Sequence, residues 1–372
     1  MNDNPMLAHA KSVSPLIRDI FTQLELKTRT ILTTPEIFEI RHMILFGCGD
    51  SFSAAEGAAN VFLNLCGFTV QIVPTMTASR YLAQTLPILG KHVLAVGVSN
   101  SGAPARIVEA MKAMSAHGAR TLAVTGDPES PMAQVADRVL EVQTPPFEPE
   151  APGIRSYVVA QITLYLLAIR ISEVTGQITM AKSDAYREEL RSSGTQLERG
   201  YGKVKDFFEP FAKTISRCGR LELLASGACR GSADFGAAKL IEANGMDAVS
   251  QDVEEFAHLN LFRRDPAHLP TILLAPSDDP SYGRCTEVAK ALETLQRPFL
   301  MLTDAGTSAN GILPVTNEPI SPLFAPLLLS CLLYYLIAAV DTDPKCAYFQ
   351  GHTGPWSEKD FPDVRHSSIK IY

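Results

Sequence analysis

The chain of 372 residues is predicted to fold as an α/β protein with two tandem, doubly wound parallel-sheet domains. Short apolar runs alternate with helical stretches of about 10–15 residues, a pattern typical of βαβ units and a parallel sheet. Matching landmarks recur at a nearly constant offset: 180 residues from Gly47 to Gly227, 178 from Gly97 to Ala275, and 178 from Thr121 to Phe299. We therefore expect one fold that occurs twice in the chain.

Composition and charge exclude several other classes of protein. Hydrophobic residues make up 46% and charged residues 20%, which is typical of globular proteins and excludes a disordered chain or a coiled coil. The 33 Lys and Arg against 40 Asp and Glu give a net charge of −7, and no segment is strongly basic. Nucleic acid is therefore not an expected partner, and an anionic ligand would have to be held by local geometry.

The predicted elements follow the same order in both halves. In the first half, strands are expected at residues 43–46, 69–73, 92–98, 120–124 and 138–142. Helices are expected at 52–65 and 105–116, and another is expected to begin at Ser130-Pro131, a good N-cap with proline at N1. In the second half, strands are expected at 221–225, 246–250, 271–275 and 298–302. An extra helix at 14–28 and a polar helical stretch at 182–213 complete the pattern.

These elements predict four segments of chain. Residues 1–34 form an N-terminal helical extension, 35–195 the first sheet domain, 196–345 the second sheet domain, and 346–372 a C-terminal arm. The sequence from Asp341 onward is rich in Pro, Gly and Asp, so we expect it to lie as an extended arm.

One segment has the length and polarity of a membrane span. Leu323–Val340 is a run of eighteen uncharged residues, which is either a transmembrane helix or a fully buried helix of an α/β domain. Pro326 near its start and the lack of a flanking basic cluster favour the buried helix. The seven cysteines, without a C-x-x-C motif, favour a reduced, intracellular chain without structural zinc. The N-terminus lacks a signal-peptide pattern, so we expect a cytoplasmic protein with no membrane partner.

Two glycine- and serine-rich loops are candidates for binding an anion. Gly47-Cys48-Gly49-Asp50-Ser51 and Ser99-Asn100-Ser101-Gly102 each follow a predicted strand and precede a helix. Helix N-termini at the carboxyl ends of parallel strands offer free N–H groups to anions, and serine hydroxyls add donors. The alternative is that both are tight turns with capping serines. Cys48 is either a nucleophile or, as we favour, a small residue that lines the site.

The pair GCGDS and SNSG, about fifty residues apart in a βα pattern, resembles the sugar isomerase (SIS) domain. Two such domains in one chain resemble the isomerase half of glucosamine-6-phosphate synthase and related phosphosugar isomerases, deaminases and deglycases. The resemblance spans roughly residues 35–345. It implies flavodoxin-like domains, a sugar-phosphate ligand, and chemistry that uses neither a metal nor a cofactor.

A second motif carries the resemblance into the second half. Gly236–Glu242, which reads GAAKLIE, resembles the family helix that ends in the glutamate general base, and His258 ends an E-x-x-H motif sixteen residues later. At about 100° per residue, one continuous helix would put the two on nearly opposite faces. Asn244-Gly245 is a helix stop, and Asp252 with Glu255 resembles a capping box, so the chain turns between them. The two groups can then face a common cleft.

The resemblance gives these residues roles. Glu242 is the proton shuttle between C1 and C2 of the sugar, and His258 opens the sugar ring. In the family this histidine reaches into the neighbouring subunit's site, which implies a homodimer. The alternative is an exposed helix carboxylate and a helix histidine with a satisfied hydrogen bond.

The sequence departs from the family at several positions. Asp50 stands where the family has a threonine, so it either points at a sugar hydroxyl or caps the helix, and Pro104 replaces another threonine. Arg155 is a candidate counter-charge for an anion. Lys370 is the nearest match to the C-terminal lysine of the synthase.

These observations predict a phosphosugar ketose/aldose isomerase that acts through an enediol. The alternatives are an amino-sugar-phosphate deaminase, a fructosamine-6-phosphate deglycase, and a sugar-phosphate-binding regulatory protein without catalysis.

Overall fold

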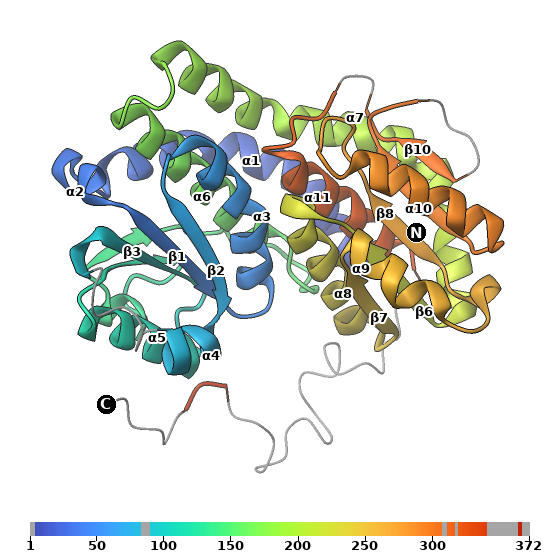
Figure 1. Ribbon diagram of the computed structural model, residues 1–372, viewed down its shortest axis with the longest axis horizontal. Helices are drawn as coiled ribbons and strands as arrows, with labels where there is room; N and C mark the ends of the chain where they lie inside the picture. The colour runs from blue at the N-terminus through green and yellow to red at the C-terminus, as the bar shows by residue number, and fades with distance from the viewer. Residues whose placement is uncertain (1–3, 83–89, 307–310, 317–318, 341–363, 367–372) are drawn as a thin grey trace. The chain divides into compact units, whose positions relative to one another are not determined.

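The protein folds around two five-stranded sheets in which all paired strands are parallel (Figure 1). The computed structural model describes residues 4–82, 90–306, 311–316, 319–340 and 364–366. The strand order is β2-β1-β3-β4-β5 in the first sheet and β10-β9-β8-β6-β7 in the second. Read from the β7 edge, the second sheet repeats the order of the first, with β6 in the place of β1. The predicted class of two tandem, doubly wound parallel sheets is confirmed.

Residue contacts divide the chain into two compact units that interleave along the sequence. The first-sheet unit consists of Ile17–Pro146, Arg155–Arg191 and Lys359–Tyr372. The second-sheet unit consists of Met1–Leu16, Phe147–Ile154 and Ser192–Glu358. The helices α1 (Pro5–Thr30) and α7 (Met180–Cys218) each contribute residues to both units. The linear boundaries predicted from the sequence are a coarser description of this division, and they stay a prediction.

In the first-sheet unit, the register of the strands brings their carboxyl ends to one level. Its strands are β1 (His42–Gly47), β2 (Thr69–Pro74), β3 (Val93–Val98), β4 (Arg120–Thr125) and β5 (Arg138–Glu141). Its helices include α2 (Thr34–Glu39), α3 (Asp50–Leu65), α4 (Thr75–Thr77), α5 (Ala105–Ala116) and α6 (Arg155–Val174). Gly47 at the end of β1 pairs with Val98 at the end of β3, which in turn pairs with Val124 of β4. The loops that leave β1 and β3 therefore start side by side.

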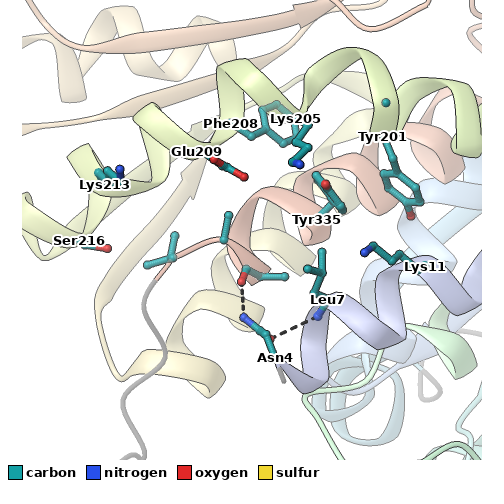
Figure 2. Close-up of a pocket in the computed structure, with 14 residues that line it drawn as sticks. Asn4, Leu7, Lys11, Tyr201, Lys205, Phe208, Glu209, Lys213, Ser216 and Tyr335 are labelled. Carbon is teal, nitrogen blue, oxygen red and sulfur yellow. Dashed lines mark hydrogen bonds between the residues drawn. The ribbon is translucent and has the colours of Figure 1, made fainter. Parts of the chain in front are cut away.

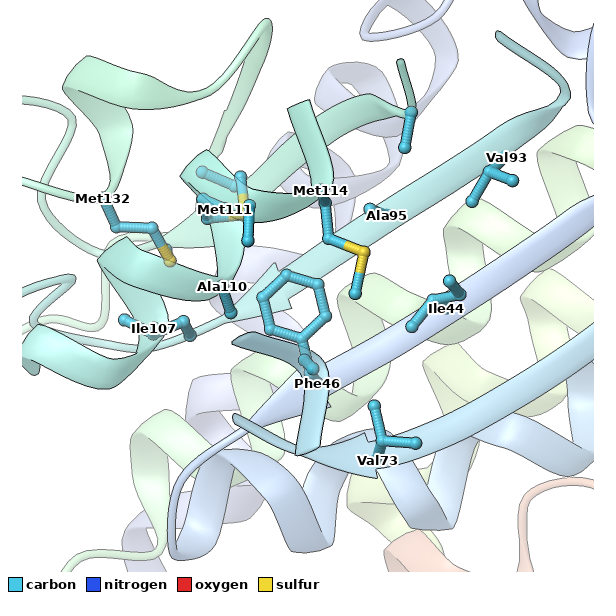
Figure 3. Packing of buried hydrophobic residues seen from close by; sticks show 14 residues of the cluster. Ile44, Phe46, Val73, Val93, Ala95, Ile107, Ala110, Met111, Met114 and Met132 are labelled. Carbon is cyan, nitrogen blue, oxygen red and sulfur yellow. The ribbon is translucent and has the colours of Figure 1, made fainter. Parts of the chain in front are cut away.

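Helices cover both faces of this sheet. Alternate residues of β1 and β3, Ile44, Phe46, Val93 and Ala95, pack with Ile107 and Met111 of α5 and with Met132 (Figure 3). The α3 helix covers β1 and β2, and α6 packs against α3. Every residue of β3 is buried, as expected for a strand between two helical layers. Gly97 is required there, because a Cβ atom at this position would lie 2.8 Å from Met111 Sδ.

The second-sheet unit is layered in the same way. Its strands are β6 (Arg220–Leu224), β7 (Asp247–Gln251), β8 (Thr271–Leu274), β9 (Phe299–Thr303) and β10 (Ile312–Pro314). Its helices include α8 (Arg230–Asn244), α9 (Val253–His258), α10 (Tyr282–Thr294) and α11 (Ala325–Ala338). Phe256 of α9 and Val288 of α10 pack on Leu273 and Met301. The α8 helix packs on α11, and a Cβ atom at Gly236 would lie 2.2 Å from a Leu333 methyl carbon.

Most predicted elements lie within two residues of the observed ones, but several differ, among them the stretch predicted at 182–213, whose helix α7 ends five residues later at Cys218. The helix expected to begin at Ser130-Pro131 is wrong, because the segment forms turns and a single 3-10 turn at Ala133–Val135. There Met132 N–H donates to the Gly102 carbonyl and the Met132 side chain enters the core, so the segment is held by the neighbouring loop. The helix predicted at 14–28 extends over Pro5–Thr30, and β10 was not predicted.

Two helices are apolar enough to raise the question of a membrane. All fourteen residues of α11, within the predicted run Leu323–Val340, are buried, so the expectation of a core helix is confirmed. Among the described residues, α6 is the helix with the length and composition of a membrane span. Of its most apolar stretch, 83% is buried inside the protein, which is how a core helix behaves.

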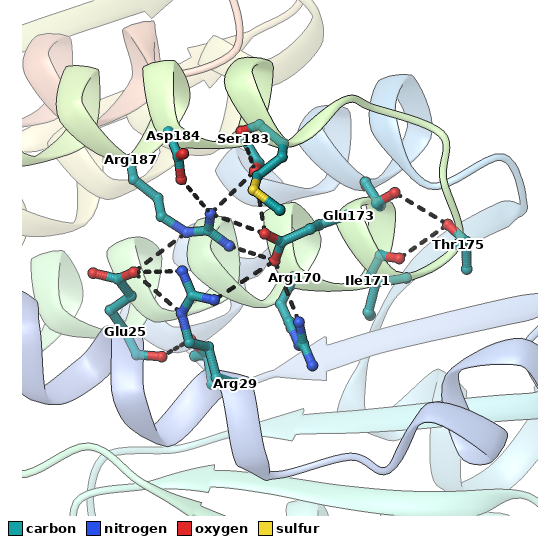
Figure 4. A network of polar contacts seen from close by, with 12 residues as sticks. Glu25, Arg29, Arg170, Ile171, Glu173, Thr175, Ser183, Asp184 and Arg187 are labelled. Carbon is teal, nitrogen blue, oxygen red and sulfur yellow. Dashed lines mark hydrogen bonds and ion pairs between the residues drawn. The ribbon is translucent and has the colours of Figure 1, made fainter.

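A network of charged side chains in the first-sheet unit links α1, α6 and α7 (Figure 4). Arg187 of α7 is 6% exposed and donates to Glu173 Oε2 of α6 at 2.8 Å, and it also lies 3.5 Å from Glu25 of α1. Burial alone would raise the pKa of Glu173. The hydrogen bond and positive charge of Arg187, together with Arg29, outweigh burial and hold this pKa below its ordinary value near 4.5.

Replacing Glu173 by Gln is expected to lower the free energy of unfolding at pH 7 by about 1–3 kcal/mol, because buried Arg187 loses a charged acceptor. The folded-state pKa of Glu173 lies below the unfolded value, so its contribution is present above pH 4.5 and is lost as the pH falls through the folded value. Urea denaturation from pH 7 to pH 3 should therefore show a smaller decrease in the free energy of unfolding for Glu173→Gln than for the native protein. The matched control is Glu188→Gln, since Glu188 is 74% exposed and its pair with Arg191 should contribute less than about 0.5 kcal/mol. Equal pH profiles for Glu173→Gln and the native protein would contradict the prediction.

Candidate functional site

The first predicted loop turns directly from β1 into α3. Gly47 ends β1, and Gly49 is the N-cap of α3 with a left-handed φ of 52°. Asp50 is the first residue of α3, where a carboxylate is favoured by the positive end of the helix dipole. The alternative that Asp50 caps the helix is wrong, because Gly49 is the N-cap and no side chain makes a capping hydrogen bond. Ser51 follows in the first turn and is half-buried.

Cys48 lies at the tip of this loop and is exposed. Its Sγ lies 3.0 Å from Oγ1 of Thr75, the residue that follows β2. Because β2 is the neighbour of β1 on the outer side of the sheet, this contact connects the first loop to the next strand end. The sequence analysis did not include Thr75 among the site residues.

The second predicted loop is held in shape by its own serines. Ser99 is 6% exposed, and its Oγ accepts a hydrogen bond from Gly102 N–H at 3.1 Å. Ser101 Oγ accepts from Ala103 N–H at 3.4 Å. Because each hydroxyl oxygen already accepts from the backbone, its O–H remains able to donate to a ligand. The Asn100 carbonyl accepts from Gly126 N–H at 2.9 Å, which fixes this loop to the end of β4.

The structure brings several of these residues to one place within the first-sheet unit. Asp50 and Ser51 of the first loop, Asn100 of the second, and Ser156 at the start of α6 line a small hollow of about 20 Å³. That volume is sufficient for about one water molecule. On the other side of Asn100 lies an open cavity of about 600 Å³, also lined by Ser101 and Asp127. The three loop ends thus converge, with room for a small polar ligand beside them.

Of the other predicted binding residues, Arg155 is buried at the start of α6 and Lys370 lies outside the described residues. Arg155 begins α6 but is 9% exposed, and its Nη2 donates to the Pro145 carbonyl at 3.2 Å. Burial lowers the pKa of Arg155. It is Ser156, the next residue, that lines the hollow, so the role of Arg155 as a counter-charge stays a prediction.

In the second-sheet unit, Glu242 is paired with a buried lysine. Lys239 is 1% exposed, and its Nζ donates to Glu242 Oε2 at 2.7 Å, while the Glu242 side chain is 38% exposed. The same ammonium group lies 5.3 Å from the centre of the Phe235 ring, within the range of a cation–π contact. The pairing needs the close approach at Gly236, which seats α8 on its neighbours. Glu242 is therefore a half-exposed carboxylate held from behind by a buried positive charge.

His258 ends a short helix that starts where the sequence predicts. Gly245 ends α8 with a φ of 64°, and Asp252 Oδ1 caps α9 by accepting from Glu254 N–H at 2.8 Å. The capping box is not formed, because Asp252 N–H donates to Gln251 Oε1 and not to Glu255. The His258 side chain is 64% exposed, and its Nε2 lies 2.8 Å from Glu254 Oε1.

The contact with His258, and the further contact with Arg284, hold the pKa of Glu254 below its ordinary value. In the described structure, Glu242 and His258 therefore each have a local partner, Lys239 and Glu254. The predicted common cleft for the pair stays a prediction.

Sequence reasoning named neither Lys239 nor Ser156 as a site residue. Lys239 stands three residues before Glu242, a spacing at which helix residues contact each other, so the i,i+3 pattern could have identified the pair. Ser156 follows Arg155 directly, and only the direction of the first turn of α6 decides which of the two faces the loops.

The corresponding strand ends of the second sheet are filled by carboxylates of the same unit. Ser226 Oγ donates to Asp252 Oδ2 at 2.7 Å, and Ser277 donates to Asp304 through both N–H at 2.7 Å and Oγ at 3.0 Å. We do not expect an anion at these strand ends. The serine donors already bind carboxylates, and these carboxylates are negatively charged. Among the residues that the structure describes, no group of His, Cys, Asp or Glu side chains is arranged to hold a metal ion.

Comparison with known proteins agrees with this geometry in the first-sheet unit. Residues 36–170 match the family model of the SIS domain. They include both glycine- and serine-rich loops. The match covers one domain, and the second unit has the same strand order.

Curated relatives extend over more of the chain. The isomerizing glutamine–fructose-6-phosphate aminotransferase of Rhizobium meliloti is 23% identical over 315 residues, covering 82% of this chain and 50% of the relative. The enzyme of the same name from Symbiobacterium thermophilum is 30% identical over 167 residues, covering 45% of this chain and 27% of the relative. The chain thus spans about half the length, or less, of the curated relatives it matches.

Solved structures share the fold at low sequence identity. The C-terminal domain of glucosamine-fructose-6-phosphate aminotransferase from Francisella tularensis matches with a TM-score of 0.73 at 15% identity, covering 91% of this chain and 97% of that one. Tagatose-6-phosphate ketose/aldose isomerase from Escherichia coli gives 0.69 at 15%, covering 97% and 95%. Glucosamine-6-phosphate deaminase from Thermotoga maritima gives 0.67 at 18%, covering 90% and 92%.

Replacing Gly102 by Ala is expected to lower the free energy of unfolding by about 3 kcal/mol, because left-handed backbone strain and a steric clash add. Gly102 has a φ of 57°, and a Cβ atom there would lie 2.1 Å from Ser130 Oγ. The matched control is Gly49→Ala, since Gly49 has a similar φ of 52° but open space around it. That variant should lose only about 1–2 kcal/mol. Thermal and urea denaturation measure both, and equal losses would refute the role of close packing at Gly102.

Proposed function

We propose that this chain is a phosphosugar ketose/aldose isomerase that moves a proton between C1 and C2 of its substrate through an enediol. The observation that carries the proposal is the half-exposed Glu242 carboxylate paired with buried Lys239 on α8. The SIS domain at residues 36–170 and the names of the structural neighbours support the substrate class.

Binding of the phosphate is assigned to the two loops of the first-sheet unit. The hydroxyl groups of Ser51, Ser99 and Ser101 donate to the phosphate oxygens, together with backbone N–H groups of Asn100 and Ser101. The N-terminus of α3 adds the positive end of its dipole. Asp50 at this helix start is turned to a substrate hydroxyl, because a carboxylate beside a phosphate would repel it. The site thus binds an anion without a net positive charge.

Proton transfer is assigned to the second-sheet unit. With an aldose, Glu242 removes the C2 proton while the C1 carbonyl oxygen gains one, which gives an enediol. Glu242 then returns its proton to C1, and loss of the O2 proton gives the ketose. His258 opens the cyclic sugar beforehand by moving a proton between the ring oxygen and the O1 hydroxyl. A carboxylate and an imidazole suit these steps because both are common general acids and bases in enzymes.

Lys239 acts on this reaction through Glu242. A charge-assisted hydrogen bond from a buried ammonium group fixes the rotamer of the carboxylate side chain. The ammonium is itself stabilised by the Phe235 ring and by the carboxylate. Lys239 is therefore proposed as a positioning residue for the general base.

A deaminase or a deglycase is the second candidate. The position of the Asp50 carboxylate in the lining of the hollow favours it. A carboxylate in the hollow between the phosphate-type loops suits an ammonium group on an amino sugar better than a plain hexose phosphate. Release of ammonia or of a free amino acid from the substrate distinguishes these reactions from isomerisation. Binding of sugar phosphates without either product, or proton exchange, would instead indicate a regulatory protein.

Assembly and location complete the proposal. We propose a cytoplasmic homodimer in which His258 acts in the site of the partner subunit. The 64% exposure of His258 and its distance from the buried core leave it available for contact with another chain.

Replacing Glu242 by Gln is expected to lower kcat by about 10²–10⁴-fold with little change in KM, because general-base catalysis is lost and binding is kept. Solvent exchange of the C2 proton, followed by NMR in D2O with a panel of hexose, pentose and amino-sugar phosphates, measures the step directly. The control is Glu255→Gln, which removes an exposed carboxylate from α9 in the same unit. Retained C2 exchange in a folded Glu242→Gln variant would overturn the assigned mechanism.

Mixing two inactive variants tests the shared site. If His258 acts in the partner's site, a heterodimer of Glu242→Gln and His258→Asn has one native site, and a random equimolar mixture recovers about a quarter of the native activity. Subunits are exchanged by mild denaturation and refolding, and activity is then measured against each variant alone. Absence of recovery, with heterodimers verified by a tag on one variant, would place His258 in its own subunit's site.

A further inference from the structure

A further cavity lies in the second-sheet unit, and its lining does not include the residues assigned to catalysis. It has a volume of about 610 Å³ and is bounded by α1, α7 and α11 (Figure 2). Its lining includes Leu7, Lys11, Tyr201, Lys205, Phe208 and Tyr335. This volume is typical of pockets that bind small organic molecules.

Aromatic side chains form the floor of the cavity. The rings of Tyr201 and Tyr335 stack with their centres 4.7 Å apart, and the Phe208 ring lies 6.2 Å from that of Tyr335. Phe208 is fully buried, and Tyr201 and Tyr335 are each 8% exposed. The floor is therefore rigid and apolar. When a flat apolar group binds on it, the rings lose little conformational entropy because they are already held in place.

Tyr335 adds one polar group to this floor. Tyr201 O–H donates to the Ala10 carbonyl at 3.1 Å, whereas the Tyr335 hydroxyl has no hydrogen-bond partner among the described residues. Burial and the nearby Glu209 carboxylate raise the pKa of Tyr335, so the hydroxyl keeps its proton. It is a donor in a mostly buried side chain that faces the cavity without an acceptor (Figure 2).

Positive charges gather around this hydroxyl. Lys11 of α1 and Lys205 of α7 lie on the two sides of Tyr335, and Lys213 lies farther along α7, beyond Glu209 (Figure 2). These three lysines are exposed and have no carboxylate or hydrogen-bond partner among the described residues. The cavity thus has a local excess of positive charge in a protein of net charge −7.

We propose that this cavity binds a small amphipathic anion, with a flat apolar body on the Tyr201 and Tyr335 floor, which Phe208 supports from behind, and an anionic group between Lys11, Lys205 and the Tyr335 hydroxyl. A carboxylate, sulfonate or phosphate at one edge of the ligand satisfies all three donors. Glu209 at the rim disfavours a second negative charge on the opposite edge. The ligand is therefore distinct from a sugar phosphate, which has no apolar body to cover the floor.

The probe for this site is 2-naphthalenesulfonate, which combines a flat apolar body with one anionic group. Isothermal titration calorimetry on the full chain should show binding to the native protein. The affinity should fall by about tenfold or more in the double variant Lys11→Gln/Lys205→Gln. Tyr335→Phe, which keeps the stacked ring and removes only the hydroxyl, should weaken binding by about threefold. Lys290→Gln, an exposed lysine on α10 outside the cavity, is the matched control and should bind as the native protein does.

Two further ligands test the two halves of the inference. 2-Naphthalenemethanol lacks the charge and sodium sulfate lacks the apolar body, and both should bind more weakly than 2-naphthalenesulfonate. The proposal is overturned if the native protein does not bind the sulfonate, if either partial ligand binds equally well, or if the Lys11/Lys205 variant binds like Lys290→Gln. Thermal denaturation of each variant checks that the exposed lysines have been replaced without unfolding, and C2 proton exchange tests the catalytic proposal separately.

Discussion

The parallel pairing of β1 with β3 is the constraint on which the candidate site depends. Because Gly47 pairs with Val98, the loops after both strands begin at the same level and on the same edge of the sheet. The strand order reverses at this pair, with β2 on one side and β4 on the other, and ligands of doubly wound sheets bind at such a point. Met111 on one face and the α3–α6 pair on the other keep the strands in place, so the loop geometry follows from core packing.

The two copies of the fold differ in what their strand ends offer. In the first-sheet unit, serine hydroxyls accept from the backbone of their own loop and keep their O–H groups for a ligand. In the second-sheet unit, the corresponding serines donate to Asp252 and Asp304, so carboxylates of the same unit occupy the position of an anion. The same topology thus gives one loop set that suits an anion and one that excludes it, through a few side chains at equivalent strand ends.

Two charge pairs with buried members in the second-sheet unit differ in the exposure of their carboxylates. Glu222 and Arg297 are each 1% exposed and pair with each other, so both charges are neutralised inside the protein. In the second pair, Lys239 is equally buried but its partner Glu242 is 38% exposed. In this second pair one carboxylate is accessible to solvent, while the hydrogen bond from the buried ammonium group holds it in place. This asymmetry in burial is the reason for assigning chemistry to Glu242 and structure to Glu222.

The sequence by itself determined the α/β class, the duplication and the glycine-serine loops, because these depend on local periodicity and on residues with special backbone freedom. Gly245 and Asp252 marked the ends of α8 and α9 for the same reason. Only the tertiary structure decided that Ser156 and not Arg155 faces the loops, and that Ser130-Pro131 starts no helix. Those outcomes depend on burial and on contacts between residues far apart in the chain, such as Met132 with the core around Phe46. A linear pattern of residue types does not contain that information, whereas packing fixes it.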